Sequence, residues 1–149
     1  MSLSREDTQL RDRLRRWLDA QPRGVAELTE KPASPGGYPL FVLTPAAPGA
    51  CAITLWVGDG NRLSASLDVG GAWWDWLSDA PGYLEALCDA VAGGHVLEQT
   101  RCLGGLRVAR QVTLSLQDHK PLRHAVLSPF LFLPFPKWNN HASAPWMSS

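Results

Sequence analysis

Hydrophobic side chains recur along this chain with two different periods, and each period predicts a different kind of element. Residues 5–19 and 79–92 each carry an apolar stripe at helical spacing, with charged side chains on the rest of the first segment. Ser4 is a candidate N-cap of the first helix, with Asp7 three residues on, and Asp79 is a candidate N-cap of the second, with Pro81 in its first turn. The apolar positions are Leu10, Leu14, Trp17 and Leu18, then Leu84, Leu87, Cys88 and Val91. We therefore expect two amphipathic helices.

Apolar and polar residues alternate in most of the remaining chain, which predicts strands. Two pairs of strands flank short glycine-containing turns, at 58–61 and 103–105, and each pair predicts a β-hairpin. The prolines around the first strand favour an edge position for it, and residues 22–37 are rich in proline and glycine, which predicts a loop with one helical turn near 25–29. The predicted strands cover residues 38–43, 51–57, 62–69, 95–102, 106–117 and 122–127.

Together these elements predict one α+β domain over residues 1–149: a mixed, mainly antiparallel sheet of about five to six strands with two amphipathic helices. Residues 1–21 hold the N-terminal helix. Residues 128–149 form a tail in which prolines interrupt aromatic side chains, so it suits neither a helix nor a central strand. Its apolar side chains must be buried against its own domain or against a sister chain.

The composition indicates the cellular compartment of the protein and excludes some classes of partner. Fourteen basic and fourteen acidic residues cancel, which disfavours nucleic acid and anionic membranes as partners. No apolar run suits an export signal or a membrane span, so a cytoplasmic protein is expected. Three cysteines without CxxC spacing predict reduced thiols rather than a zinc or redox centre.

The most unusual segment runs from Gly70 to Asp79 and holds Trp73, Trp74, Asp75 and Trp76. Tryptophan is enriched where proteins bind partners, and its ring also stacks on sugars. Two interpretations stay open: the rings close one end of the core, or they form a surface for a partner or ligand. Asp75 and Asp79 are a turn residue and a helix cap, or carboxylates that aromatic walls tune for acid catalysis.

No pattern for catalysis or metal binding is present. The four histidines, His95, His119, His124 and His141, lack the HExxH and HxH spacings of metal sites, and the chain has no GxSxG element and no glycine-rich phosphate loop. We therefore predict no catalytic residue, no metal and no cofactor.

Residues 50–117 have a distinct order of elements: Leu63–Val69, then Gly70-Gly71 and the aromatic cluster, a helix, Gly93-Gly94, and the hairpin Val96–Leu116. This order resembles small uncharacterised bacterial α+β proteins, some of which are similar to immunity proteins of toxin systems. Such proteins often carry histidine among the aromatic residues, whereas this chain has Ala72-Trp73-Trp74-Asp75-Trp76. The departure weighs against a shared metal or acid-base site.

The small single domain, the excess of tryptophan, the apolar tail and the absence of a catalytic pattern favour a cytoplasmic protein that binds a protein partner, and the resemblance implies a toxin that it neutralises. The candidate binding residues come from the tryptophan-rich segment and are Trp73, Trp74, Asp75, Trp76 and Asp79. The alternative is a small-ligand or carbohydrate binding protein, or an enzyme, that uses the same segment. A third interpretation is a homo-oligomer held together by the C-terminal tail.

Overall fold

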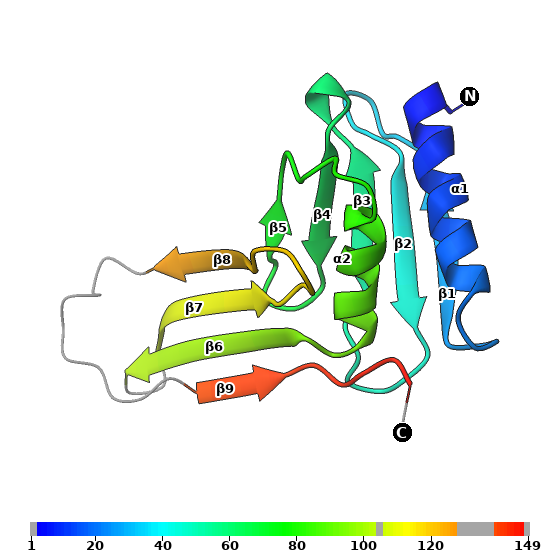
Figure 1. Cartoon of the computed structure of the whole chain (residues 1–149). Coiled ribbons are helices and arrows are strands. Elements are labelled where there is room, and N and C mark those ends of the chain that lie inside the picture. The colour runs from blue at the N-terminus through cyan, green and yellow to red at the C-terminus, as the bar shows by residue number, and fades with distance from the viewer. Residues whose placement is uncertain (1–2, 104–105, 128–138, 148–149) are drawn as a thin grey trace.

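The computed structural model describes residues 3–103, 106–127 and 139–147 and arranges them as two helices and two antiparallel sheets (Figure 1). The α+β class is confirmed. The strands divide into sheets of five and four, however, rather than forming one sheet of five to six. In chain order the elements are α1 (Arg5–Asp19), β1 (Ala26–Lys31), β2 (Leu40–Pro45), β3 (Ile53–Val57), a short 3₁₀ helix (η1, Asp59–Asn61), β4 (Leu63–Leu67), β5 (Trp73–Trp74), α2 (Tyr83–Ala92), β6 (Val96–Leu103), β7 (Leu106–Leu114), β8 (Leu122–Leu127) and β9 (Asn139–Ala142).

The first sheet is an antiparallel meander in the order β1-β2-β3-β4-β5. The predicted hairpin of β3 and β4 is confirmed, with Leu55 opposite Ala65 and Val57 opposite Leu63. Two expectations are wrong. Residues 26–31 form a strand rather than a loop, because they pair with β2 along their whole length, and β2 is therefore a central strand rather than an edge. The pattern of β1 is weak because most of its residues are exposed.

Helix α1 begins where the sequence predicts. The Ser4 hydroxyl accepts a hydrogen bond from the Asp7 backbone amide at 3.1 Å and donates to the Asp7 carboxylate at 2.7 Å, which satisfies an amide that the helix leaves unpaired. Leu10, Leu14 and Trp17 of the predicted stripe are buried. No helix in the described part of the chain is long and apolar enough to cross a membrane.

Helix α2 begins later than predicted. Its N-cap is Gly82, in a left-handed conformation, and not Asp79. The Ser78 side chain accepts a hydrogen bond from the Ala80 amide, and Ala80 in turn accepts from Tyr83, so the backbone turns twice before the helix begins. The predicted stripe, including Cys88, is buried.

The second sheet has the order β8-β7-β6-β9 and extends away from the helices (Figure 1). The hairpin of β6 and β7 and the strand β8 confirm the predicted strands. Strand β9 was not predicted; it comes from the tail and pairs with β6, with Leu97 opposite Ala142. Arg110, which interrupts the apolar face of β7, forms an ion pair with Glu98 on β6, with 3.7 Å between Nε and Oε2.

The described end of the tail is part of the same core as the helices. Trp146 is buried, and its indole Nε1 donates to the Cys51 carbonyl oxygen at 2.9 Å, while its backbone amide donates to the Ala92 carbonyl oxygen at 2.8 Å. The backbone of residues 143–145 packs closely against Gly94, because Gly94 has no side chain. A Cβ at Gly94 would lie 2.8 Å from the Ser143 carbonyl oxygen. Residues 139–147 are thus held by their own chain, while residues 128–138 of the predicted tail lie outside the described residues.

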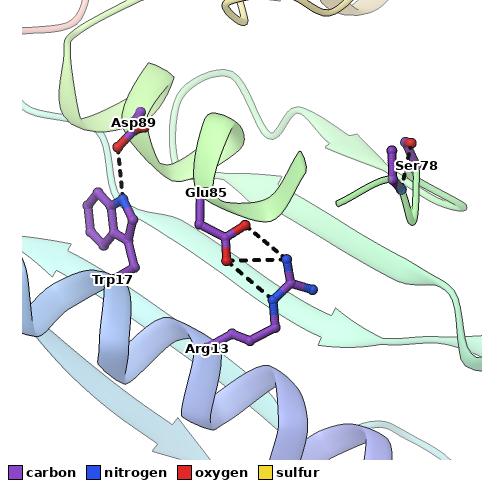
Figure 2. A network of polar contacts seen from close by, with 6 residues as sticks. Arg13, Trp17, Ser78, Glu85 and Asp89 are labelled. Atoms are coloured by element: carbon purple, nitrogen blue, oxygen red, sulfur yellow. Dashed lines mark hydrogen bonds and ion pairs between the residues drawn. The ribbon is translucent and has the colours of Figure 1, made fainter. Parts of the chain in front are cut away.

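Both helices cover the same face of the first sheet (Figure 1). Polar contacts connect them: the Arg13 guanidinium pairs with the Glu85 carboxylate at 2.9 Å, and the Trp17 indole donates to Asp89 at 2.8 Å (Figure 2). The large buried side chains of β2 and β3 point to this covered face. They are Phe41, Leu43, Ile53 and Leu55.

Candidate functional site

The tryptophan-rich segment connects the first sheet to α2, and a tight turn places its start against the second sheet. Gly70 and Gly71 both have positive φ, at 64° and 63°. A Cβ at Gly70 would lie 2.8 Å from Val112 Cγ2 and 2.9 Å from Glu98 Oε2, so only glycine fits there without displacing the second sheet. The segment is therefore fixed at its start by both sheets.

The three tryptophans have different environments. Trp74 is half-buried against the core, and its Nε1 donates to the Arg123 carbonyl oxygen of β8 at 3.0 Å. Trp73 is 51% exposed and Trp76 is 69% exposed, although the Trp73 ring also lies 6.1 Å from the His124 ring, centroid to centroid. Each of the two interpretations from the sequence thus describes part of the cluster: Trp74 packs, whereas Trp73 and Trp76 face solvent.

Trp76 has an unusual backbone conformation, with φ of 54°. This left-handed region is unfavourable for a bulky residue and has to be imposed by the surroundings. The next residue supplies the constraint: Leu77 is buried, its amide donates to the Leu63 carbonyl oxygen at 2.8 Å, and its own carbonyl oxygen accepts from Arg62 at 3.3 Å. The exposed indole of Trp76 is therefore presented from a fixed backbone.

Asp75 and Asp79 do not form a pair. Asp75 accepts a hydrogen bond at 2.9 Å from the hydroxyl of Ser64, which is buried on β4. Asp79 is exposed and lines a different groove, beside Glu6 and Arg13 of α1. The structure therefore gives no support for two carboxylates acting on one substrate, and Asp79 is not the helix cap that the sequence predicts.

Sequence reasoning missed two neighbours of Asp75, because the fold brings them from distant loops. Tyr38, which precedes β2, donates a hydrogen bond to Asp59 of η1. This hydrogen bond raises the pKa of the Tyr38 hydroxyl above its ordinary value, and the negative charges of Asp59 and Asp75 add to the effect. Tyr38 is 38% exposed. An aromatic ring and a second carboxylate thus lie near Asp75.

These residues lie along the face of the first sheet that is opposite the helices. Strand register places Thr29, Val42, Thr54, Ser66 and Trp73 in one row across all five strands. Side chains in such a row share one face of a sheet, and no described helix covers this one. Trp56 lies on the same face, opposite Ser64. We call this surface, together with Trp76 in the loop that follows β5, the tryptophan face; its distinctive side chains are Tyr38, Trp56, Asp59, Trp73, Asp75 and the exposed Trp76.

A second concave region, which sequence reasoning also missed, lies between α2 and the turn after β7. It has a volume of about 780 Å³, and its lining includes Glu85, Asp89, His95, Asp118 and His119. Two of the carboxylates are already engaged by α1 (Figure 2). The His119 ring packs edge-on against Tyr83, with centroids 5.1 Å apart. Among the described residues, no three histidine, cysteine or acidic side chains are arranged to hold a metal ion.

The cysteines are free thiols, as expected. Burial raises the pKa of Cys51 to about 12, helped by its hydrogen bond to Asp68, and burial also raises the pKa of Cys88. A thiol attacks as the thiolate, so neither cysteine is suited to nucleophilic catalysis.

Comparison with protein-family models, with curated proteins and with solved structures finds no significant match.

Proposed function

We propose that this chain is a cytoplasmic protein-binding protein that holds its partner on the tryptophan face, and that neutralisation of a bacterial toxin is the most concrete form of this function. The observation that carries the proposal is the exposure of Trp73 and Trp76 on a constrained backbone. Large aromatic rings that are exposed before binding and need no reordering supply much of the affinity of protein interfaces.

The surroundings of the two indoles support a protein partner over a small ligand. The grooves between α2 and the turn after β7, and between α1 and the loop after β5, have other linings and leave Trp73 and Trp76 outside. The tryptophan face extends over five strands, which suits the roughly 800 Å² that each partner buries in a stable complex. Free cysteines support a reducing compartment.

The test is affinity capture of the tagged protein from its host, in the wild type and in the double variant Trp73→Ala, Trp76→Ala. Trp74 is left intact because it packs against the core and bonds β8. Met147→Ala is the matched control, since Met147 is also about half exposed but follows the buried Trp146 on a different part of the molecule. Circular dichroism and denaturation confirm that each variant folds.

We expect one stoichiometric protein partner with the wild type and the control, and none with the double variant. With the purified partner, calorimetry should give a Kd raised about 100-fold or more by the double substitution, as expected for two hot-spot residues. Retention of the partner by the double variant would show that another surface binds it. Absence of any partner would favour the alternative of a small ligand or carbohydrate stacking on the exposed rings.

A further inference from the structure

Acidic side chains are unevenly distributed in this chain, although its net charge is zero. Residues 51–95 contain six acidic residues but only one basic residue, Arg62. The acidic ones are Asp59, Asp68, Asp75, Asp79, Glu85 and Asp89. This region also contains every tryptophan of the tryptophan face. The neutral total therefore conceals an acidic stretch of the chain.

Three of these carboxylates are bound by α1 or by residues 51–52. Glu85 and Asp89 bond α1, and Asp68 accepts hydrogen bonds from the Cys51 thiol and the Ala52 amide. Asp59 and Asp75 accept hydrogen bonds from the neutral hydroxyls of Tyr38 and Ser64, and Asp79 is exposed. None of them forms an ion pair with another described residue, and Arg62 directs its guanidinium to the Leu77 carbonyl oxygen instead.

Two of these carboxylates, Asp59 and Asp75, lie beside the exposed aromatic ring of Tyr38. Asp59 and Asp75 both lie near the Tyr38 hydroxyl, and Asp75 lies between Trp73 and Trp76 in the chain. Carboxylates accept two parallel hydrogen bonds from a guanidinium, and aromatic rings attract the same cation through their faces. Both features favour one kind of side chain on the partner.

Building on the proposed function, we propose that the partner is a protein that presents a cluster of arginine or lysine side chains to the tryptophan face. Arginine is favoured, because its planar group can contact a carboxylate and stack on an indole at the same time. The charges of Asp59 and Asp75 would also attract a basic partner and raise its association rate.

Other occupants fit less well. Nucleic acid would bring phosphates to uncompensated carboxylates, which repel them. A second copy of this chain has no net charge, so it would bring as many acidic as basic side chains. Arg11, Arg13 and Arg15 are already paired with acidic residues of their own chain. A different, basic protein therefore satisfies the surface best.

The experiment uses synthetic hexa-arginine and hexa-glutamate peptides as probes, titrated by calorimetry in 50 mM and 300 mM NaCl. The test variant is Asp59→Asn, Asp75→Asn, in which the amide oxygens can still accept the hydrogen bonds from Tyr38 and Ser64. The control Asp12→Asn, Asp19→Asn removes the same charge from exposed positions on α1, on the opposite side of the sheet. The double variant Trp73→Ala, Trp76→Ala completes the set.

We expect hexa-arginine to bind the wild type more weakly at the higher salt concentration, and hexa-glutamate not to bind. The test variant and the tryptophan variant should each lose about tenfold in affinity, and the control less than about twofold. Equal losses in the test and control variants would overturn the proposal, because binding would then follow net charge alone.

The two proposals fail in different ways. If hexa-arginine does not bind but a captured partner is still lost with the tryptophan variant, the basic partner is wrong and the protein-binding function stands. If light scattering shows a dimer that the test variant dissociates, the occupant is a second copy, and the proposal of a basic partner of different sequence is overturned.

Discussion

The indole rings of Trp17 and Trp146 meet edge to face, with their centroids 5.8 Å apart and their planes at 82°. One ring comes from the N-terminal helix and the other from the last residues described. Each indole nitrogen also has an acceptor elsewhere in the fold, Asp89 for Trp17 and the Cys51 carbonyl oxygen for Trp146. The two ends of the chain therefore close the core together.

This contact predicts that the C-terminal residues are needed for stability. Trp146→Ala should lower the free energy of unfolding by about 3 to 5 kcal/mol, because it leaves a cavity beside Trp17 and removes the donor to Cys51. Urea denaturation followed by far-ultraviolet circular dichroism measures the change. Met147→Ala, at an exposed neighbour, should stay within about 0.5 kcal/mol of the wild type. Equal effects of the two substitutions would contradict the packing of Trp146.

The left-handed backbone at Trp76 should lower the stability of the fold, whereas its exposed side chain should contribute little to packing. Because its φ is 54°, Trp76→Gly should be more stable than Trp76→Ala, by about 1 kcal/mol. The same comparison at Trp73, a residue of β5 without positive φ, should have the opposite sign, because glycine weakens a strand. Thermal denaturation of the four variants checks both differences. A more stable alanine at position 76 would mean that the backbone there is not left-handed.

The turn at Gly70 should be far more sensitive to substitution than the next residue. Gly70→Ala and Gly71→Ala both place alanine at a positive φ, which costs about 1 kcal/mol or more. Only the Gly70 Cβ would also meet Val112 and Glu98, whereas the Gly71 Cβ would meet nothing within 4 Å. Gly70→Ala should therefore be the less stable variant by a further 1 to 3 kcal/mol, approximately the cost of overpacking. Equal denaturation midpoints would show that the second sheet does not pack on this turn.

The cysteines should differ in reactivity, and stability should fall at alkaline pH. In the native protein Cys102, which is partly exposed, should react with a thiol reagent at pH 8 well before the buried Cys51 and Cys88.

A raised native pKa means that the folded state holds its proton more tightly than the unfolded state. The stabilising contribution of Cys51 is therefore complete below about pH 9 and is lost as the pH rises toward 12.

Reagent titration with and without denaturant, and denaturation from pH 7 to 10.5, measure these effects. Cys51→Ser serves as the comparison, since it removes the titrating thiol and should flatten the alkaline part of the pH profile. Rapid labelling of all three thiols in the native state would contradict the burial of Cys51 and Cys88.

Local signals in the sequence were sufficient for much of the secondary structure. The capping pattern at Ser4 and the apolar stripes of α1 and α2 predicted the helices because a helix repeats within a few residues. The hairpin β3-β4 was predictable for the same reason, since one short turn joins its strands. The start of α2 was missed because the Ala80 amide donates to the Ser78 side chain and the Tyr83 amide donates to the Ala80 carbonyl oxygen. These hydrogen bonds form turns after Asp79, so the helix begins only at Tyr83.

The sequence by itself thus determined the α+β class, the two helices, the hairpins and the unusual tryptophan segment. The tertiary structure alone decided that the strands form two sheets, that β1 and β9 are strands, and that Trp74 packs while Trp73 and Trp76 face solvent. It also placed Tyr38 and Asp59 near Asp75. The physical reason is that strand pairing and side-chain burial depend on residues far apart in the chain, and their positions are set only when the whole core closes.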